Sequence, residues 1–255
     1  MGVTTVRTES LEGVTRVVLD NPPLNILTRR MLAELREAIA RVAADESMRA
    51  VVLSAEGKHF SAGADVREHL PPEYGELIPE FLATIEALVE CDLPVIAAVR
   101  GRCLGAGFEL VQAADLVIAG ESATLGQPEI RLGVLPPAAC ALLPRRCRWG
   151  TAVAVVLGGE PLTAVEAQAA GLVYRMVPDD AVDSAAGELG ARMARHSGTV
   201  IRLGKRALRD AAEVSLADGL ALAGETYVGR LMETQDAVEG LRAFGEKRQP
   251  EWRHR

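Results

Sequence analysis

Two glutamates lie in apolar surroundings near the middle of the chain. Glu109 stands between Phe108 and Leu110, and Glu129 follows in the stretch Gly126-Gln127-Pro128-Glu129-Ile130. A carboxyl group in such a stretch is either exposed at the start of a helix or partly buried with a raised pKa. Two carboxyl groups in one dry pocket can divide the work of a general acid and a general base. The spacing leaves open whether these two meet, because a strand is predicted between them.

Two turns that contain glycine each follow an apolar run that is predicted to be a strand. Both turns are candidates for binding a negatively charged group. The first turn spans residues 59–65 and the second spans residues 101–109. Glycine and alanine let a backbone approach a ligand closely and leave its N–H groups to act as donors. If Ala106 or Gly107 begins a helix, its unpaired N–H lies at the positive end of the helix dipole. Either turn alone is more simply a tight strand-to-helix connection, but two such donors converging from separate loops would form an oxyanion hole.

Several other kinds of active site are excluded by what the motifs lack. The pattern Gly105-Ala106-Gly107 has Leu110 where a dinucleotide fingerprint needs a third glycine, and no phosphate-loop motif is present. No G-x-S-x-G motif marks a serine hydrolase, and no Cys/His cluster has the spacing of zinc ligands. We therefore expect no metal site. Free, buried and reduced thiols are expected at the four cysteines, Cys91, Cys103, Cys140 and Cys147.

The composition is that of an ordinary globular protein. With 49% apolar and 25% charged residues, the chain of 255 residues is long enough to bury a large core. Its formal net charge of −7 argues against a sequence-independent nucleic-acid binder, which needs a positive surface. No uncharged apolar run is long enough to span a membrane, and the first 13 residues lack the apolar core of a secretory signal. We therefore expect a cytoplasmic protein that binds neither membrane nor nucleic acid.

Short apolar runs alternate with helical patterns in the first half of the chain. Thr28 is expected to cap a helix whose apolar residues recur every three or four positions, and a second helix is expected over residues 77–89. In that second helix the predicted buried stripe comprises Ile78, Leu82, Ile85 and Val89. Continuous apolar segments predict strands at residues 15–19, 50–53, 95–99 and 116–119. This alternation indicates an α/β architecture.

Helical signals dominate beyond residue 160. Thr163 and Glu166 form a predicted capping box, and Gly171 stands where a helix C-cap glycine belongs. Successive helices are then predicted over residues 179–196, 199–213, 215–233 and 235–248. We expect a core of residues 1–195 and a C-terminal helical region of residues 196–255, whose many alanines and glycines permit close packing of helices.

Five motifs, in order along the chain, resemble those of the crotonase superfamily, the enoyl-CoA hydratase/isomerase family. They are Asn21-Pro22-Pro23-Leu24-Asn25, Phe60-Ser61-Ala62-Gly63-Ala64-Asp65, Gly105-Ala106-Gly107-Phe108-Glu109-Leu110, Gly126-Gln127-Pro128-Glu129 and Phe244-Gly245-Glu246-Lys247-Arg248. The resemblance covers nearly the whole chain. It implies a spiral of ββα units followed by an all-helical region that mediates trimers, often paired into hexamers. It also implies an acyl-CoA substrate and no separate cofactor, because coenzyme A is part of the substrate.

The resemblance assigns roles residue by residue. The two acid/base glutamates of the hydratases fall on Glu109 and Glu129, and the two N–H donors of the oxyanion hole fall on Ala64 and Ala106. Ala106 stands where hydratases more often carry glycine, so its methyl group narrows the space beside the thioester. Contacts to the substrate or its coenzyme A moiety are implied for Leu24, Ala62, Asp65, Gly105, Phe244 and Lys247.

Two segments depart from the pattern of ordinary hydratases, and both wall the acyl pocket in the family. Val134-Leu135-Pro136-Pro137-Ala138-Ala139-Cys140 replaces a glycine-rich loop, and residues 69–74 also differ. Both segments are most similar to those of the cyclohexa-1,5-diene-1-carbonyl-CoA hydratases. Because proline fixes φ, we expect a stiff apolar loop that suits a flat ring better than a long acyl chain. The residues of this expected wall are Leu135, Pro136 and Pro137.

Three functions remain open at this point. Hydration of an α,β-unsaturated acyl-CoA is the leading one, with a cyclic dienoyl-CoA as a candidate substrate. A double-bond isomerase would use one glutamate as a proton shuttle. A non-catalytic, RNA-binding homologue is opposed by the net charge and by the presence of both glutamates, but the cluster Arg145-Arg146-Cys147-Arg148 keeps it open.

Overall fold

The computed structural model describes residues 4–255, so residues 1–3 of the predicted core lie outside the described part. Its main sheet has the strand order β1-β2-β3-β4-β6-β9. Strand β1 pairs antiparallel with β2, and the other neighbours pair in parallel. The strands are β1 (Val6–Leu11), β2 (Val14–Leu19), β3 (Ala50–Ala55), β4 (Val95–Val99), β6 (Leu116–Gly120) and β9 (Arg175–Val177). The four predicted strands are confirmed as β2, β3, β4 and β6, whereas β1 is an exposed, polar edge strand that gives no apolar signal.

A second, smaller sheet lies beside the first in the order β5 (Arg102–Leu104), β7 (Thr124–Gly126) and β8 (Leu162–Thr163). Two isolated bridges extend it, one joining Leu27 to Ala64 and the other joining Ser61 to Cys103. Successive passes of the chain therefore run from the main sheet to this second layer and then toward a helix. The α/β class and the spiral of ββα units are confirmed. The turns of the second layer carry the residues of the candidate site.

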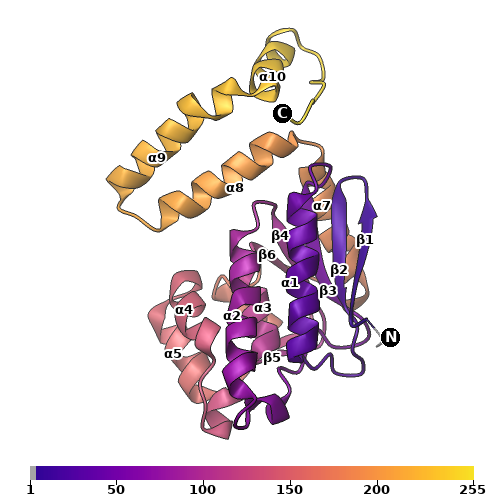
Figure 1. Cartoon of the computed structure of the whole chain (residues 1–255), viewed down its shortest axis with the longest axis vertical. Helices are drawn as coiled ribbons and strands as arrows, with labels where there is room; N and C mark the ends of the chain where they lie inside the picture. The colour runs from indigo at the N-terminus through magenta and orange to yellow at the C-terminus, as the bar shows by residue number, and fades with distance from the viewer. Residues whose placement is uncertain (1–3) are drawn as a thin grey trace.

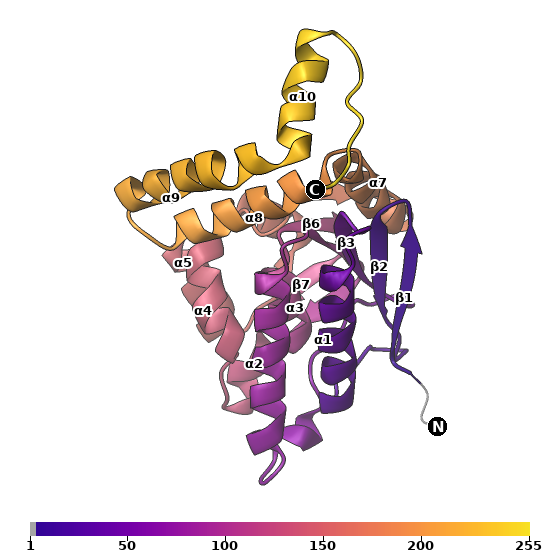
Figure 2. The ribbon, with the colours of Figure 1, turned by 45° about the horizontal axis from the view of Figure 1, so that its top comes forward.

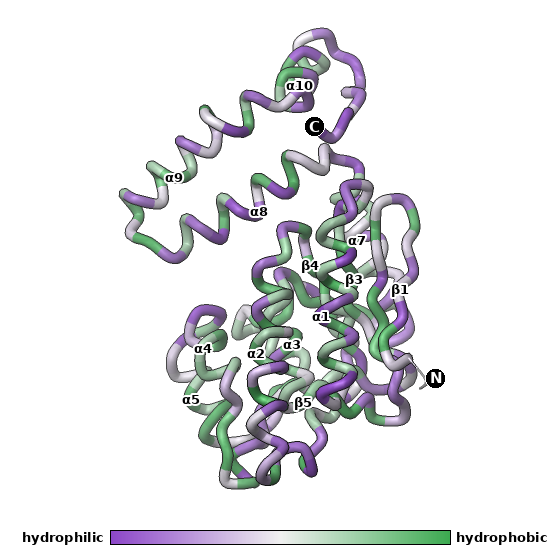
Figure 3. Tube along the Cα trace, in the orientation of Figure 1, coloured by the Kyte–Doolittle hydropathy of each residue, from purple (hydrophilic) through white to green (hydrophobic). Residues whose placement is uncertain are grey.

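Helices cover both faces of the main sheet (Figure 1). On one face lie α1 (Arg29–Ala44), α2 (Tyr74–Glu90) and α3 (Ala106–Ala113), which share the larger core with the sheet. On the other face lies α7 (Val182–Ala194), which packs on alternate residues of β3, β4 and β6. Every residue of β3 and β4 is buried, as expected for strands covered on both sides. Apolar stretches accordingly follow these inner elements in Figure 3.

The start of α1 is as predicted, but the buried face of α2 is not. Thr28 caps α1, where its side chain accepts a hydrogen bond from the Met31 N–H. In α2 the predicted stripe is wrong at Leu82, which is 41% exposed. The buried stripe is displaced around the helix from the predicted one and shares only Ile85 with it. The residues buried in the structure are Leu77, Phe81, Thr84, Ile85 and Leu88.

Two further helices, α4 (Pro137–Arg146) and α5 (Trp149–Gly158), occupy a stretch that carries no clear sequence signal. The capping box of Thr163 and Glu166 is confirmed at the start of α6 (Ala164–Ala169). Short 3-10 turns complete the core region: η1 (Val66–His69), η2 (Pro128–Leu132) and η3 (Asp179–Ala181). The four cysteines are free, with Cys91 and Cys103 buried. The prediction of buried thiols is wrong for Cys140, because its helix α4 turns this position to the surface.

The C-terminal helices extend away from the sheets (Figure 2). They are α8 (Gly198–Ala212), α9 (Leu216–Gly229), η4 (Leu231–Glu233) and α10 (Gln235–Gly245). The predicted helices are confirmed here, with a short 3-10 turn before α7 and another after α9. No helix within residues 4–255 is long and apolar enough to cross a membrane.

Candidate active site

The two glycine turns lie directly against each other. Ser61 N donates to Arg102 O at 3.1 Å, and Leu104 N donates to Ser61 O at 2.9 Å. A Cβ placed on Gly105 would lie 3.6 Å from Gly63 Cα, which is van der Waals contact, so the two turns touch. The second sheet therefore carries the ends of both turns to one place, as an oxyanion hole requires.

Ser61 braces the first turn from within. Its hydroxyl donates to Asn25 O at 2.7 Å and accepts from Gly63 N at 3.1 Å, and the side chain is fully buried. The Asn25 amide in turn donates to Glu56 O and His59 O. From the sequence alone Ser61 is assigned no role of its own, because the partners that it holds, Asn25 and Gly63, are known only from the structure.

The amides of Ala64 and Ala106 are left without a partner at this junction. Leu27 N donates to Gly63 O, and Asp65 N donates to Leu27 O. These backbone hydrogen bonds involve the residues on either side of Ala64 but leave the Ala64 N–H unpaired. Of the two predicted helix starts, Ala106 and Gly107, the structure has Ala106 as the first residue of α3, after Gly105 with its φ of 55°. Within residues 4–255 neither N–H donates a hydrogen bond. The structure thus offers two free donors where the sequence predicted them, and their role remains a prediction.

Glu109 is buried at the start of α3 and faces the start of another helix. It is 2% exposed, and its Oε1 accepts from Ala138 N at 2.7 Å and from Ala139 N at 2.9 Å, in the first turn of α4. Burial raises the pKa of Glu109 to about 8; the nearby Glu129 raises it further, and the two N–H donors oppose the rise. At neutral pH this carboxyl group therefore holds a proton readily.

Glu129 lies in η2, half-buried against the second glycine turn. A Cβ placed on Gly105 would lie only 2.7 Å from Glu129 Oε1, so glycine leaves room for this carboxyl group. Burial raises the pKa of Glu129 to about 7. Gly105 lies one helical turn before Glu109, and Glu129 is near enough to Glu109 to raise its pKa. The structure thus brings the two predicted acid/base residues to one end of α3.

The remaining predicted contact residues divide into two groups. Ala62 N donates to Leu24 O at 2.9 Å, and Asp65 follows Ala64, so these residues surround the first turn together with Gly105. The Asp65 carboxylate is bound by Arg67, whose N, Nε and Nη2 all donate to it. Phe244 and Lys247 lie elsewhere, in and just after α10, which packs on α8 and η4 at the far side of the molecule from α3 (Figure 2).

Of the expected proline wall, Leu135 and Pro136 lie in a short loop, whereas Pro137 is part of a helix. Pro137 is the first residue of α4, because proline fits the first position of a helix without losing a hydrogen bond. Pro136 is buried just before it. Leu135, at 62% exposure, faces solvent in this chain. The double proline therefore starts the helix whose N–H groups hold Glu109, and the expected loop is wrong for residues 137–140, which are helical.

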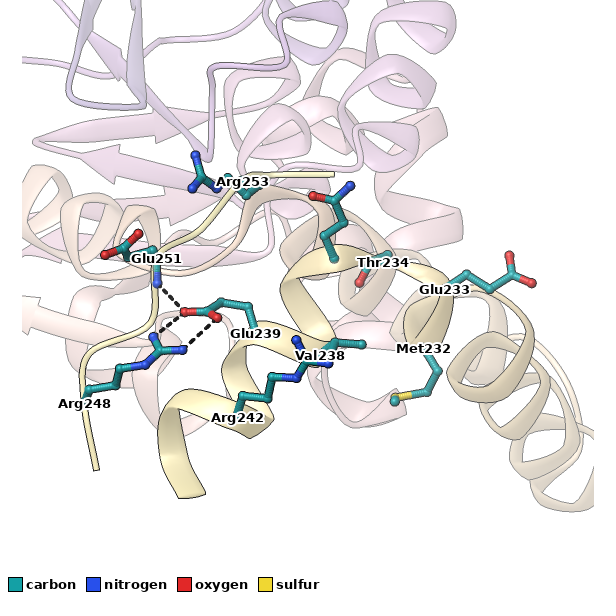
Figure 4. Close-up of a pocket in the computed structure, with 10 residues that line it drawn as sticks. Met232, Glu233, Thr234, Val238, Glu239, Arg242, Arg248, Glu251 and Arg253 are labelled. Carbon is teal, nitrogen blue, oxygen red and sulfur yellow. Dashed lines mark hydrogen bonds and ion pairs between the residues drawn. The ribbon is translucent and has the colours of Figure 1, made fainter. Parts of the chain in front are cut away.

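A cavity of about 570 Å³ lies far from these carboxyl groups, between α10 and the C-terminal tail (Figure 4). Its charged side chains bind one another: the Glu239 carboxylate accepts from both terminal nitrogens of Arg248 and from Glu251 N. The Arg248 guanidinium lowers the pKa of Glu239 to about 2. A carboxylate held ionised in this way suits an ion pair, not proton transfer. Residues 4–255 contain no cluster of three or more His, Cys, Asp or Glu side chains able to hold a metal ion.

The burial of Glu109 predicts a pH dependence of stability. The unfolded chain titrates this group near pH 4.5 and the folded chain near pH 8. Its favourable contribution is therefore present below pH 4.5 and lost as the pH rises toward 8, with a cost on the order of a few kcal/mol. Glu109→Gln keeps the acceptor oxygen and removes the charge, so its melting temperature at pH 9 should exceed that of the unchanged protein. Exposed Glu188→Gln on α7 is the control, and equal melting curves for Glu109→Gln and wild type would contradict the assigned burial cost.

Comparisons with known proteins show the family and the fold of the chain. The family model for enoyl-CoA hydratase/isomerase matches residues 9–255. A cyclohexa-1,5-dienecarbonyl-CoA hydratase from Thauera aromatica is 35% identical over 240 residues, covering 94% of this chain and 93% of the relative. A 2,3-dehydroadipyl-CoA hydratase from Escherichia coli strain K12 is 38% identical over 236 residues, covering 91% of each. The crystal structure of an enoyl-CoA hydratase from Bacillus anthracis superposes with a TM-score of 0.94 at 32% identity, covering 98% of this chain and 100% of that one. The chain therefore belongs to the enoyl-CoA hydratase/isomerase family and has its crotonase fold.

Proposed function

We propose that this enzyme adds water across the α,β double bond of an acyl-CoA thioester. The observation that carries the proposal is the junction of the two glycine turns. Two unpartnered N–H groups, at Ala64 and Ala106, lie there beside the buried Glu109 and the half-buried Glu129, whose pKa values are both raised. Donors of this kind stabilise an oxyanion, and paired carboxyl groups exchange protons.

The proposed reaction follows from these groups. The thioester oxygen accepts hydrogen bonds from the N–H groups of Ala64 and Ala106, which draws electrons from the double bond as an enolate forms. Near neutral pH the pair of Glu109 and Glu129 holds about one proton between them, because both pKa values are raised. The ionised carboxylate takes a proton from the attacking water, and the other carboxyl group delivers a proton to the α-carbon. No separate cofactor enters this scheme.

For the acyl group we propose a cyclic dienoyl-CoA. The likeness to the Thauera aromatica hydratase and the two divergent pocket segments support this choice. Buried Pro136 joins the expected wall to α4, whose N–H groups also hold Glu109. A short, helix-anchored connection yields less to a long acyl chain than a glycine-rich loop does. The Escherichia coli relative, named for a linear dicarboxylic substrate, defines the competing possibility.

A substrate panel tests the acyl group. On one preparation, kcat/KM is measured for cyclohexa-1,5-diene-1-carbonyl-CoA, crotonyl-CoA, 2,3-dehydroadipyl-CoA and a ten-carbon enoyl-CoA. Since one misplaced methylene is worth only about 1–3 kcal/mol, a true preference for the ring should exceed tenfold over each linear substrate. Equal or faster turnover of a linear substrate would contradict the cyclic assignment and leave hydration itself intact.

We also propose a homo-oligomer, a trimer or a dimer of trimers. The C-terminal helices expose large apolar side chains that a soluble surface seldom shows in such number. Among them are Leu208, Leu216, Leu220, Val228 and Phe244, each at least 66% exposed. In an assembly, Phe244 and Lys247 would be available to a neighbouring subunit, because α10 does not reach the site of its own chain (Figure 2). A cytoplasmic location stays a prediction.

A further inference from the structure

Two glutamine side chains join Glu129 to the interior of α3. Gln127 is 0% exposed and Gln112 is 4% exposed. One orientation of the Gln127 amide pairs both of its ends. Its Nε2 then donates to Glu129 Oε1 at 3.1 Å, to Glu129 Oε2 at 3.2 Å and to Gly105 O at 3.3 Å, while its Oε1 accepts from Gln112 Nε2 at 2.7 Å. In the reverse orientation its oxygen faces the carboxylate oxygens and its nitrogen faces the Gln112 amide nitrogen.

We propose that Gln112 is a positioning residue for the hydration, which it serves by holding the Gln127 amide with its nitrogen toward Glu129. The proposal deepens the function proposed above and rests on it for the catalytic role of Glu129. Gln112 itself is connected to Glu129 only through Gln127 among the described contacts. Its effect is therefore expected on the state of Glu129 and not on substrate binding.

The orientation of the amide decides which form of Glu129 is favoured. An N–H directed at a carboxyl group stabilises the ionised form, whereas a carbonyl oxygen in the same place stabilises the protonated form. Both glutamines are buried, so a hydrogen bond between them is stronger than it would be in water. Without the Gln112 donor, Gln127 can turn its oxygen toward a protonated Glu129.

Gln112 is a buried residue of α3. It lines a cavity of about 160 Å³ together with Phe108, Leu172 and Arg146. Its own Oε1 has no hydrogen-bond partner within residues 4–255, so its one described side-chain hydrogen bond is the bond to Gln127. Burying an amide oxygen without a hydrogen-bond partner costs stability. The presence of Gln112 at this position is therefore consistent with a role for its Nε2, which donates to Gln127.

The charged and titratable groups near this chain of amides are few. Glu109 of α3 and the Cys140 thiol of α4 interact with Glu129 across the site, and Arg131 of its own segment is paired with Glu160. Asp115 and Arg146 line the cavity beside Gln112. The tests below therefore leave all of these groups unchanged.

The experiment compares the unchanged protein with Gln112→Met, a variant of similar length without an amide. The ionisation of Glu129 is followed by pH-difference infrared spectroscopy on protein with ¹³C-labelled glutamate, with Glu129→Gln identifying its band. We expect the Glu129 titration to move upward by about one pH unit. On crotonyl-CoA, kcat at pH 7 should fall about tenfold with KM within twofold. Gln112→Leu is the second variant should Gln112→Met fail to fold.

A double-mutant cycle separates positioning from general damage. In a Gln127→Met background, Gln112→Met should cause no further shift, because its path to Glu129 is already cut. Leu172→Met, which alters the wall of the same cavity and leaves both amides in the chain, should leave the titration unchanged. An unmoved Glu129 titration in folded Gln112 variants, or a full additional shift in the Gln127→Met background, would overturn the proposal. The infrared result needs no substrate, so it decides on Gln112 even if no acyl-CoA is hydrated, an outcome that would refute the proposed function instead.

Discussion

Replacing Glu129 by glutamine is expected to lower kcat for hydration by about 10²–10⁴-fold while KM changes little. The amide keeps the size of the side chain beside Gly105 and cannot take or give a proton on the catalytic time scale. Glu129 is half-buried with a raised pKa, so solvent does not readily replace it. Steady-state rates with crotonyl-CoA at pH 7.5 measure the effect, and Glu109→Gln should show a loss of the same order.

The matched control is Glu160→Gln. Glu160 is largely exposed and pairs with Arg131, two residues beyond Glu129, so it tests for disturbance of the same segment without proton transfer. Its turnover should equal that of the unchanged protein. Full hydratase turnover by Glu129→Gln would refute the assignment of two catalytic carboxyl groups.

Ala64→Pro is expected to lower kcat about 100-fold or more. Proline has no N–H, and the loss of one oxyanion donor costs about 3 kcal/mol of transition-state stabilisation. The Ala64 N–H makes no hydrogen bond within residues 4–255, so its removal breaks no described contact of the fold. Kinetics with crotonyl-CoA, together with the melting temperature, separate a lost donor from a lost fold.

Two variants that keep the donors serve as controls for this change. Ala64→Gly retains the first N–H, and Ala106→Gly retains the second at a position where hydratases more often carry glycine. Both should turn over within a few fold of the unchanged protein. Normal kcat in a folded Ala64→Pro variant would show that this amide does not bind the thioester oxygen.

Much of the fold could be predicted from the local sequence, because buried strands and helices have recognisable patterns of apolar residues. Continuous apolar runs marked β3 and β4, which are covered on both faces, whereas the polar edge strand β1 had no such pattern. The double proline illustrates the limit. Proline fixes φ in a stiff loop and at the first turn of a helix alike, and only the tertiary structure shows that Pro137 begins α4.

The site could be predicted where one short motif combines an ionisable side chain with small or apolar neighbours. The small residues around Gly105 and the apolar neighbours of Glu109 and Glu129 indicated the right positions. Partners that come from distant segments left no local trace. The pairing of Gln112 with Gln127 depends on how α3 packs beside β7, and the separation of Phe244 from α3 depends on where the C-terminal helices extend.

Incorporation of solvent oxygen tests the central claim most directly. The unchanged protein is incubated with crotonyl-CoA or the cyclic dienoyl-CoA in water enriched in ¹⁸O, and the products are analysed by mass spectrometry. Hydration predicts one ¹⁸O atom in a new hydroxyl group of the product, formed at a rate that collapses in Glu129→Gln. A product whose double bond has moved without gaining ¹⁸O would show an isomerase, and the proposed hydratase would be wrong.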